Sequence, residues 1–286
     1  MSKIAIVTDS TAALPASAIN GYSIFVIPLQ LIWGDTIYRD GVDIKPEEFY
    51  AKLERSEIVP TTSQPSPAAF HELYSRLLQE GHEILSIHIS SKLSGTVDSA
   101  LQAKDMLPGA PIEVVDSEAT SMAMGFQVLH VARAIRNGAS LKEAKEIAEN
   151  AKQKAGVYFV VSTLEYLHRG GRIGGAAAFL GTVLNLKPVL ALQNGRVEAV
   201  ERVRTMSKAM NRMLDLVEHD LAKANPFELC VVHCNAPDVA GILRERVSDR
   251  FGISAAERIL FTDVSPVIGT HAGPGTVGLS YFKGSV

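Results

Sequence analysis

The 286-residue chain has very little cysteine, no excess of basic residues and no long apolar segment. Its two cysteines, Cys230 and Cys234, are too few for a disulfide framework and fit a reducing compartment. Lysine and arginine number 28 against 31 aspartates and glutamates, which gives no reason to expect a nucleic-acid partner. The uncharged stretch at 173–186 is too short to span a bilayer, and the N-terminus lacks the apolar core of a signal peptide. We therefore expect a cytoplasmic protein without an integral membrane segment.

Signatures of self-sufficient catalysis are also missing. The sequence contains neither the G-x-x-x-x-G-K-[ST] loop that holds nucleotide phosphates nor the G-x-S-x-G turn of serine hydrolases. The spacing G-x-G-x-x-G occurs at 273–278, too close to the C-terminus for the helix, strand and acidic residue of a dinucleotide site. Cys230, His233 and Cys234 lie on an apolar strand without a second ligand pair, so we expect buried thiols and no metal site.

The composition is that of a globular protein, with 47% hydrophobic and 21% charged residues, and the length favours two domains. In the first half, short apolar strands alternate with helices, which predicts an α/β domain with a parallel sheet covered on both faces. In the second half, a hairpin signal at Asn194-Gly195 among long helices predicts an α+β domain with a largely antiparallel sheet. We divide the chain into 1–155 and 156–286 and expect a ligand between the two domains, where clefts favour binding.

The elements follow from apolar periodicity and from turn signals. Strands are expected at 4–7, 23–28, 84–89, 112–115, 157–161, 188–192, 197–203, 229–233 and 258–262, with a hairpin at 31–39. Helices are expected at 46–54, 67–80, 97–106, 119–136, 141–154, 176–184, 208–223 and 237–251.

Hydroxyl-rich loops follow several strands of the predicted parallel sheet. They are residues 8–11, 90–96 and 116–117, and a further hydroxyl-rich segment, 61–66, precedes a helix. Ligands of open parallel sheets bind outside the carboxyl ends of the strands, where hydroxyl and backbone N–H groups are neutral donors for an anion. Each hydroxyl alone is explained equally well as a helix cap. Because Thr62 and Ser94 lie in loops with several hydroxyls each, we favour ligand binding for these two.

Histidine and arginine residues flanked by glycine form a second group of candidates. His271 precedes the glycine-rich loop and is suited either to a carboxylate or phosphate ligand or to a structural role. Arg172 lies among glycines, where a guanidinium binds phosphate or a partner's acidic groups, or is ordinary surface charge. Arg202 and Arg204 are expected on one face of a strand, which makes them candidates for the same kind of contact. An ordinary solvent-exposed strand face explains this arrangement equally well.

The segments 7–11, 61–65, 90–96, 115–117, 167–174 and 271–275 resemble, in this order, the motifs of the DegV family. That family is similar to the fatty-acid-binding subunit of bacterial fatty acid kinase. The resemblance implies two α/β domains that bury a long-chain fatty acid in a tunnel between them, with no other cofactor and no catalytic residue in this chain. It also implies a partner, a separate ATP-binding kinase subunit, which converts the presented carboxylate into an acyl phosphate for phospholipid synthesis.

The resemblance also implies roles for individual positions. The positions implied to bind the carboxylate are Thr62, Ser94 and His271, with Ser63, Gly95 and Thr96 as neighbours. Arg172 and Arg204 match basic positions implicated in partner engagement or phosphoryl transfer, with Arg202 as the alternative to Arg204. Apolar residues that suit the tunnel wall, and equally a packed core, are Ile27, Leu29, Ile32, Phe179, Leu180, Val183 and Leu184.

Two other functions remain open at this point. Asp9 directly follows the first strand, so a self-sufficient hydrolase or phosphatase would use it together with the hydroxyl loops. A lipid sensor that controls another protein is the third hypothesis.

Overall fold

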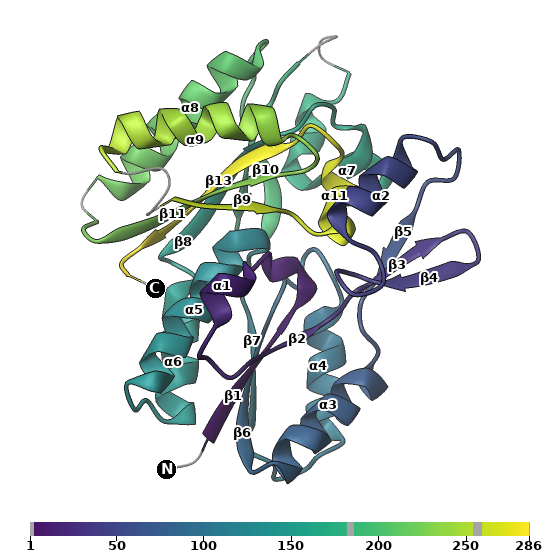
Figure 1. The fold of residues 1–286 in the computed structure, drawn as a ribbon, viewed down its shortest axis with the longest axis vertical. Coiled ribbons are helices and arrows are strands. Elements are labelled where there is room, and N and C mark those ends of the chain that lie inside the picture. Colours follow the sequence, from purple (N-terminus) through teal and green to yellow (C-terminus); the bar gives the residue numbers. More distant parts are fainter. Residues whose placement is uncertain (1–2, 182–185, 223, 254–258, 286) are drawn as a thin grey trace.

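The computed structural model describes residues 3–181, 186–222, 224–253 and 259–285. A four-stranded sheet in the N-terminal half has the order β2-β1-β6-β7, and every neighbouring pair is parallel (Figure 1). Its strands are β1 (Lys3–Asp9), β2 (Ile24–Ile27), β6 (His82–His88) and β7 (Ile112–Asp116). The parallel sheet predicted for the first half is confirmed.

Helices cover both faces of this sheet because its strands carry apolar side chains on both sides. The helices are α3 (Pro67–Gln79), α4 (Thr96–Asp105), α5 (Ser121–Arg136) and α6 (Leu141–Ala151). Ala5 and Val7 of β1 belong to the core beneath α3 and α4. Ile4 and Ile6, which point to the opposite face, belong to the core beneath α5 and α6.

The second sheet has six strands in the order β10-β9-β8-β13-β11-β12, and only the β11–β12 pair is parallel. The strands are β8 (Ala155–Val160), β9 (Val189–Gln193), β10 (Arg196–Glu201), β11 (Phe227–His233), β12 (Ile259–Asp263) and β13 (Val277–Lys283). Helices α8 (Met206–Leu221) and α9 (Pro237–Phe251) cover one face (Figure 1). The largely antiparallel sheet is therefore confirmed. It begins at Ala155, beside the predicted domain boundary, which itself stays a prediction.

Helix α5 is shared by the two sheets. Met122 and Phe126 pack in one cluster with Val232 and Phe282 of the second sheet. Val128 belongs instead to the core of the first sheet. Figure 1 shows α5 between the two sheets. A helix in this position must be apolar around most of its circumference, which agrees with the burial of nearly all residues from Ser121 to Ala132.

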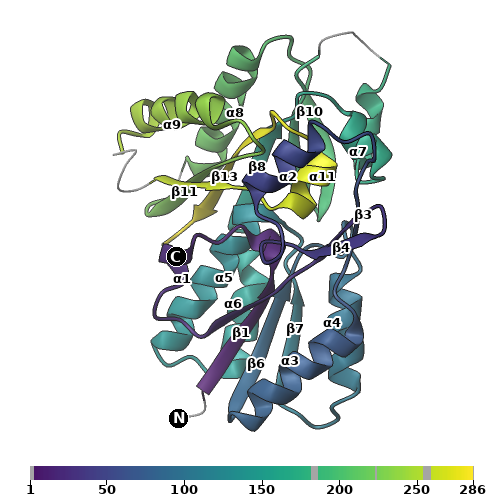
Figure 2. The ribbon, with the colours of Figure 1, turned by 45° about the vertical axis from the view of Figure 1, so that its right-hand side comes forward.

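A small antiparallel sheet of order β4-β3-β5 extends from the first half to the second. Its elements are β3 (Gln30–Trp33), β4 (Thr36–Arg39) and β5 (Thr61–Ser63), with α2 (Pro46–Leu53) between β4 and β5. Leu31 and Trp33 pack in one cluster with Val264 and with Ala272 of α11 (Pro266–Ala272). Figures 1 and 2 both show α2 beside α11.

The structure corrects the prediction in three places. Residues 61–63 form β5 rather than a loop, because pairing with β3 satisfies their backbone groups although their side chains are polar. The helix predicted at 176–184 is a short 3-10 helix, η2 (Gly174–Phe179), whose alanines offer little apolar surface, and residues 182–185 lie outside the described ranges. Arg202 and Arg204 follow β10 rather than lie on it, since pairing with β9 resumes after a bulge at Ala199–Glu201 but ends at Glu201.

Three shorter helices complete the described chain: η1 (Ser10–Ala12), α1 (Ala16–Ile19) and α7 (Glu165–Arg169). Within the described ranges, no helix has both the length and the apolar composition needed to cross a membrane.

The position of α5 depends on a glycine. A Cβ on Gly125 would lie 2.7 Å from the carbonyl oxygen of Ala12 and 2.8 Å from the sulfur of Met122. We expect Gly125→Ala to lower the free energy of unfolding by about 1–3 kcal/mol, measured by urea denaturation, because the backbone near Ala12 must move. The control is Gly241→Ala in α9, where nothing lies within 4 Å of the added Cβ. The free energy of unfolding of the control should rise by about 0.5–1 kcal/mol. A similar rise for Gly125→Ala would contradict the close approach of position 125 to Ala12 and Met122.

Candidate functional site

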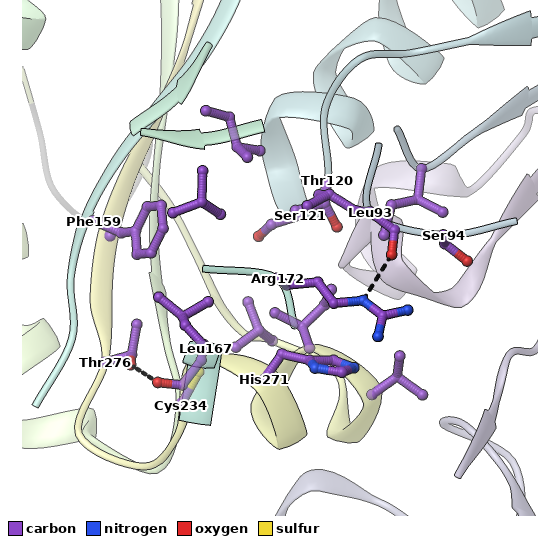
Figure 3. A pocket seen from close by; sticks show the side chains of 18 of the residues that line it. Leu93, Ser94, Thr120, Ser121, Phe159, Leu167, Arg172, Cys234, His271 and Thr276 are labelled. Carbon is purple, nitrogen blue, oxygen red and sulfur yellow. Dashed lines mark hydrogen bonds between the residues drawn. The ribbon is translucent and has the colours of Figure 1, made fainter. Parts of the chain in front are cut away.

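An apolar cavity lies between the two halves of the chain (Figure 3). Its apolar lining residues are Leu29, Ile89, Leu93, Val157, Phe159, Leu167, Leu192, Val197, Val232, Val264, Val267, Ile268 and Ala272. The cavity volume is about 110 Å³. In the same measure, one water molecule needs about 10–15 Å³. The protein's own side chains therefore leave this space open.

The polar side chains of the lining include the predicted hydroxyls. The Nε2 atom of His271 lies 2.7 Å from the Oγ1 atom of Thr62. Ser63 and Ser94 also line the cavity, and the hydroxyl of Ser94 lies 2.9 Å from that of the fully buried Thr96. Figure 3 shows His271 and Arg172 next to each other, with Ser94 on the same side of the pocket. Residues that are far apart in the sequence thus form one polar end.

Three segments hold this polar end in place. Pairing of β5 with β3 sets Thr62 opposite Leu31. A Cβ on Gly95 would lie 3.0 Å from the side-chain nitrogen of Gln64, so the loop that carries Ser94 runs close beside β5. Because Gly95 has no side chain, the two hydroxyl segments can approach each other this closely.

The short helix α11, which carries His271, is fixed at its N-terminus. The hydroxyl of Ser265 caps it, and the buried carboxylate of Asp40 accepts a hydrogen bond of 3.4 Å from the N–H of Val267. Asp40 also accepts a hydrogen bond of 2.6 Å from the hydroxyl of Ser10, just after β1. Burial raises the pKa of Asp40 to about 6. This carboxyl group therefore ties α11 to both sheets of the first half.

Arg172 lines the cavity, whereas the family resemblance implies a role for it in partner engagement or phosphoryl transfer. Its Nε atom donates to the carbonyl oxygen of Leu93 at 3.0 Å, and its Nη1 atom donates to that of Gly170 at 2.7 Å. In the described part of the chain, no ion pair joins Arg172 to a carboxylate. The cavity thus has a positive charge without a negative partner among the residues that the structure describes.

His271 is neutral near neutral pH. Burial, followed by the positive charge of Arg172, lowers the pKa of His271 to about 4. Its Nδ1 atom is buried without a hydrogen-bond partner among the described residues and faces Gly170, where any side chain would clash with the ring. The polar end therefore combines one positive charge with neutral donors.

The remaining predicted site residues lie elsewhere. Gly95 and Thr96 are next to Ser94 but do not line the cavity. Arg204 is exposed and also lies outside the lining. Arg202 donates to the carbonyl oxygen of Ala178 at 3.1 Å, and its guanidinium lies over the ring of Phe179. Both arginines are exposed, and of the two it is Arg202 whose side chain is held by these contacts.

Of the apolar residues suggested for the wall, only Leu29 lies in the described lining. Ile27 packs in the core beneath α3 and α4, Ile32 is absent from the lining, and Phe179 and Leu180 border a separate surface pocket. Val183 and Leu184 lie outside the described residues. Wall residues such as Phe159 are not predicted from the sequence, because a wall residue on a strand has the same pattern as a core residue.

Asp9 has a structural environment. It is 1% exposed and accepts hydrogen bonds from the N–H and hydroxyl of Thr11 and from the N–H of Ile89, and His88 Nδ1 lies 3.0 Å away. It is absent from the cavity lining. This environment contradicts the hypothesis of a hydrolase that uses Asp9, since no substrate reaches a carboxylate so enclosed.

Cys230 and Cys234 are both fully buried free thiols, as expected. Burial raises the pKa of the Cys234 thiol to about 12, so it stays protonated.

Comparison with known proteins agrees with this architecture. A family model that describes uncharacterised proteins of the DegV family matches residues 3–284. The chain belongs to the DegV family. It is 41% identical over 277 residues to the DegV domain-containing protein SCO2569 of Streptomyces coelicolor, covering 96% of this chain and 97% of that protein.

Solved structures of the DegV family have the same fold. A fatty-acid-binding DegV family protein from Thermus thermophilus matches with a TM-score of 0.92 and 39% identity, over 98% of this chain and 99% of that one. DegV of Bacillus subtilis, described as a fatty acid binding protein, matches with a TM-score of 0.87 and 34% identity, over 99% and 100% of the two chains.

The lowered pKa of His271 predicts how stability depends on pH. Between the unfolded pKa of about 6.5 and the folded pKa of about 4, the unfolded chain takes up a proton that the folded chain does not. Acidification from pH 7 to 4.5 should therefore cost the wild type about 2–3 kcal/mol more than it costs His271→Gln. Urea denaturation at both pH values measures this difference. The contribution of Asp40 has the opposite sign but is common to both proteins.

The control for this measurement is His219→Gln on the exposed surface of α8. It should lose the same stability on acidification as the wild type. If His271→Gln loses as much stability on acidification as this control, the prediction that His271 is buried in its neutral form is wrong.

Proposed function

We propose that this protein binds a long-chain fatty acid in the cavity and presents its carboxylate to a separate ATP-dependent kinase in the cytoplasm. The observation that carries the proposal is a largely apolar cavity at one side of which lie Ser94, the neutral His271 and Arg172, an arginine without an ion-pair partner among the described residues. The fatty-acid-binding proteins of Thermus thermophilus and Bacillus subtilis share this fold and support the same ligand class.

The polar end suits a carboxylate. Since Nδ1 of His271 has no partner in the described ranges, the tautomer with the proton on Nε2 avoids an unpaired buried N–H. His271 then donates to Thr62, which leaves the Thr62 hydroxyl proton free for a ligand oxygen. Ser94 provides a second hydroxyl, and Arg172 provides the positive charge that a carboxylate would pair with.

The apolar walls suit the acyl tail. Burial of roughly fifteen methylene groups contributes on the order of 12 kcal/mol of gross binding free energy, much of which is offset by ordering of the chain and desolvation of its carboxylate. The tail therefore supplies the affinity, and the polar end fixes the direction in which the fatty acid binds.

In the proposed reaction the partner supplies the nucleotide. A carboxylate oxygen attacks the γ-phosphorus of ATP, the new O–P bond forms, and the bond to the ADP leaving group breaks. Hydroxyl donors and one guanidinium hold the carboxylate without protonating it, so it stays a nucleophile. The acyl phosphate formed in this way is a precursor for phospholipid synthesis.

Loss of a hydroxyl at the polar end should weaken binding. We expect Thr62→Val to bind a long-chain fatty acid about tenfold more weakly, because one hydrogen bond to a charged group is lost. Isothermal titration with palmitate or stearate measures the affinity. The matched control is Thr61→Val, since Thr61 is the exposed neighbour on β5 and does not line the cavity. Equal affinities of the two variants would reject the role of Thr62.

The ligand class has a direct test. Mass spectrometry of organic extracts from protein expressed in bacteria should show a long-chain fatty acid at close to one molecule per chain. The proposal would be overturned if a different class of molecule were recovered, or if the purified chain did not bind added fatty acid.

The kinase step predicts a different phenotype for each arginine. With ATP and a fatty acid kinase subunit, Arg204→Ala should slow acyl phosphate formation while fatty acid affinity stays at the wild-type level, because Arg204 lies outside the lining. Arg172→Ala should reduce both the rate of acyl phosphate formation and the affinity for the fatty acid, because Arg172 lines the cavity. The control is Lys142→Ala, an exposed residue on α6. Acyl phosphate made by this chain without the kinase, or normal rates for Arg204→Ala, would contradict the scheme.

The lipid-sensor hypothesis shares the ligand and differs in the partner. Affinity purification of the fatty-acid-loaded chain separates the two hypotheses, since a sensor would retain a regulatory protein and support no acyl phosphate formation with the kinase.

A further inference from the structure

A second polar spot lies in the cavity wall, at the start of α5. Thr120 and Ser121 both line the cavity. Their hydroxyl oxygens are buried, and neither has a hydrogen-bond partner among the described residues. The Ser121 residue is only 5% exposed. Buried hydroxyls without partners are uncommon in folded proteins and indicate a missing ligand or water.

The backbone at this position supports the same interpretation. Ser121 has a φ of +53°, in the left-handed region that residues other than glycine rarely adopt. Such a conformation costs on the order of 1–3 kcal/mol and is concentrated at ligand sites. Thr120 is the N-cap residue of α5, but its side chain makes no capping hydrogen bond. The hydroxyls and the positive end of a sixteen-residue helix thus meet at the cavity wall.

This spot is distinct from the polar end that we assign to the carboxylate. Hydrogen bonds join Thr62 to His271 and Ser94 to Thr96, but among the described residues none joins either pair to the hydroxyl of Thr120 or Ser121. In Figure 3, the side chain of Ser121 lies between Ser94 and Phe159. Phe159 belongs to the apolar wall that we assign to the acyl tail. The two free hydroxyls therefore face the tail of the ligand rather than its carboxylate.

We propose that the cavity selects a fatty acid that carries a hydroxyl group part-way along its tail, held by Ser121 and Thr120. A plain alkyl chain leaves both serine and threonine hydroxyls buried without partners, which is unfavourable. A ligand hydroxyl accepts a hydrogen bond from one of them and donates to the other, so each of the three hydroxyl groups has a partner. This inference rests on the proposed fatty acid binding and specifies its substrate class.

The test compares stearate with a series of monohydroxystearates that differ in the carbon carrying the hydroxyl. For wild-type protein, isothermal titration should show one position of the series at which the hydroxy acid binds about tenfold more tightly than stearate, since one or two hydrogen bonds are gained. Ser121→Ala should abolish this preference, and Thr120→Val should reduce it. Both substitutions keep the Cβ and the approximate volume, and thermal denaturation verifies that the variants fold.

The chain offers a matched control in Ser280→Ala on β13. Ser280 is also fully buried with an unpartnered hydroxyl, but it does not line the cavity. It should retain the full preference for the hydroxy acid.

Each outcome decides between the explanations. If stearate binds and no member of the series binds more tightly, the two hydroxyls hold a water molecule or nothing, and the inference fails while the proposed function stands. A preference that survives in Ser121→Ala also overturns it. If neither stearate nor any hydroxystearate binds, the proposed function itself fails.

Discussion

The burial of α5 between two sheets is the constraint on which the rest of the structure depends. Because Met122 and Phe126 pack against the second sheet and Val128 packs against the first, the two halves share a helix and cannot be positioned independently. The N-terminal end of this helix forms part of the cavity wall. The helix that joins the two cores therefore also contributes to the wall of the cavity between them.

The small sheet has the complementary role of bringing distant polar residues together. Thr62 and His271 are 209 positions apart, yet their side chains contact each other because β5 pairs with β3 and α11 packs beside α2. The carboxyl group of Asp40 links α11 to the segment after β1 through its hydrogen bonds with Val267 and Ser10. The polar end of the cavity is thus built from the contacts that hold the halves together, and a change in their packing alters the site as well.

The sequence predicted the architecture well and the site in part. Strong periodic signals, such as the strands around β1 and the helix that became α5, gave the correct sheet types, since they depend on local pattern. Family motifs identified Thr62, Ser94 and His271, which the structure places in one cavity lining. Two features escaped prediction because tertiary contacts decide them. Strand β5 exists through pairing rather than propensity, and Arg172 faces the cavity because its neighbours Leu93 and Gly170 accept its hydrogen bonds.

The electrostatics of the polar end fit the presentation of a carboxylate better than its permanent storage. A protonated histidine beside Arg172 would place two positive charges against the ligand and make its oxygens poor nucleophiles. Burial and Arg172 lower the pKa of His271 instead, so the histidine acts as a neutral donor that orients the Thr62 hydroxyl. One guanidinium, already engaged by two backbone carbonyl groups, then balances one carboxylate. These features suit the proposed function, in which the apolar walls hold the tail of the acid and the polar end leaves its carboxylate reactive.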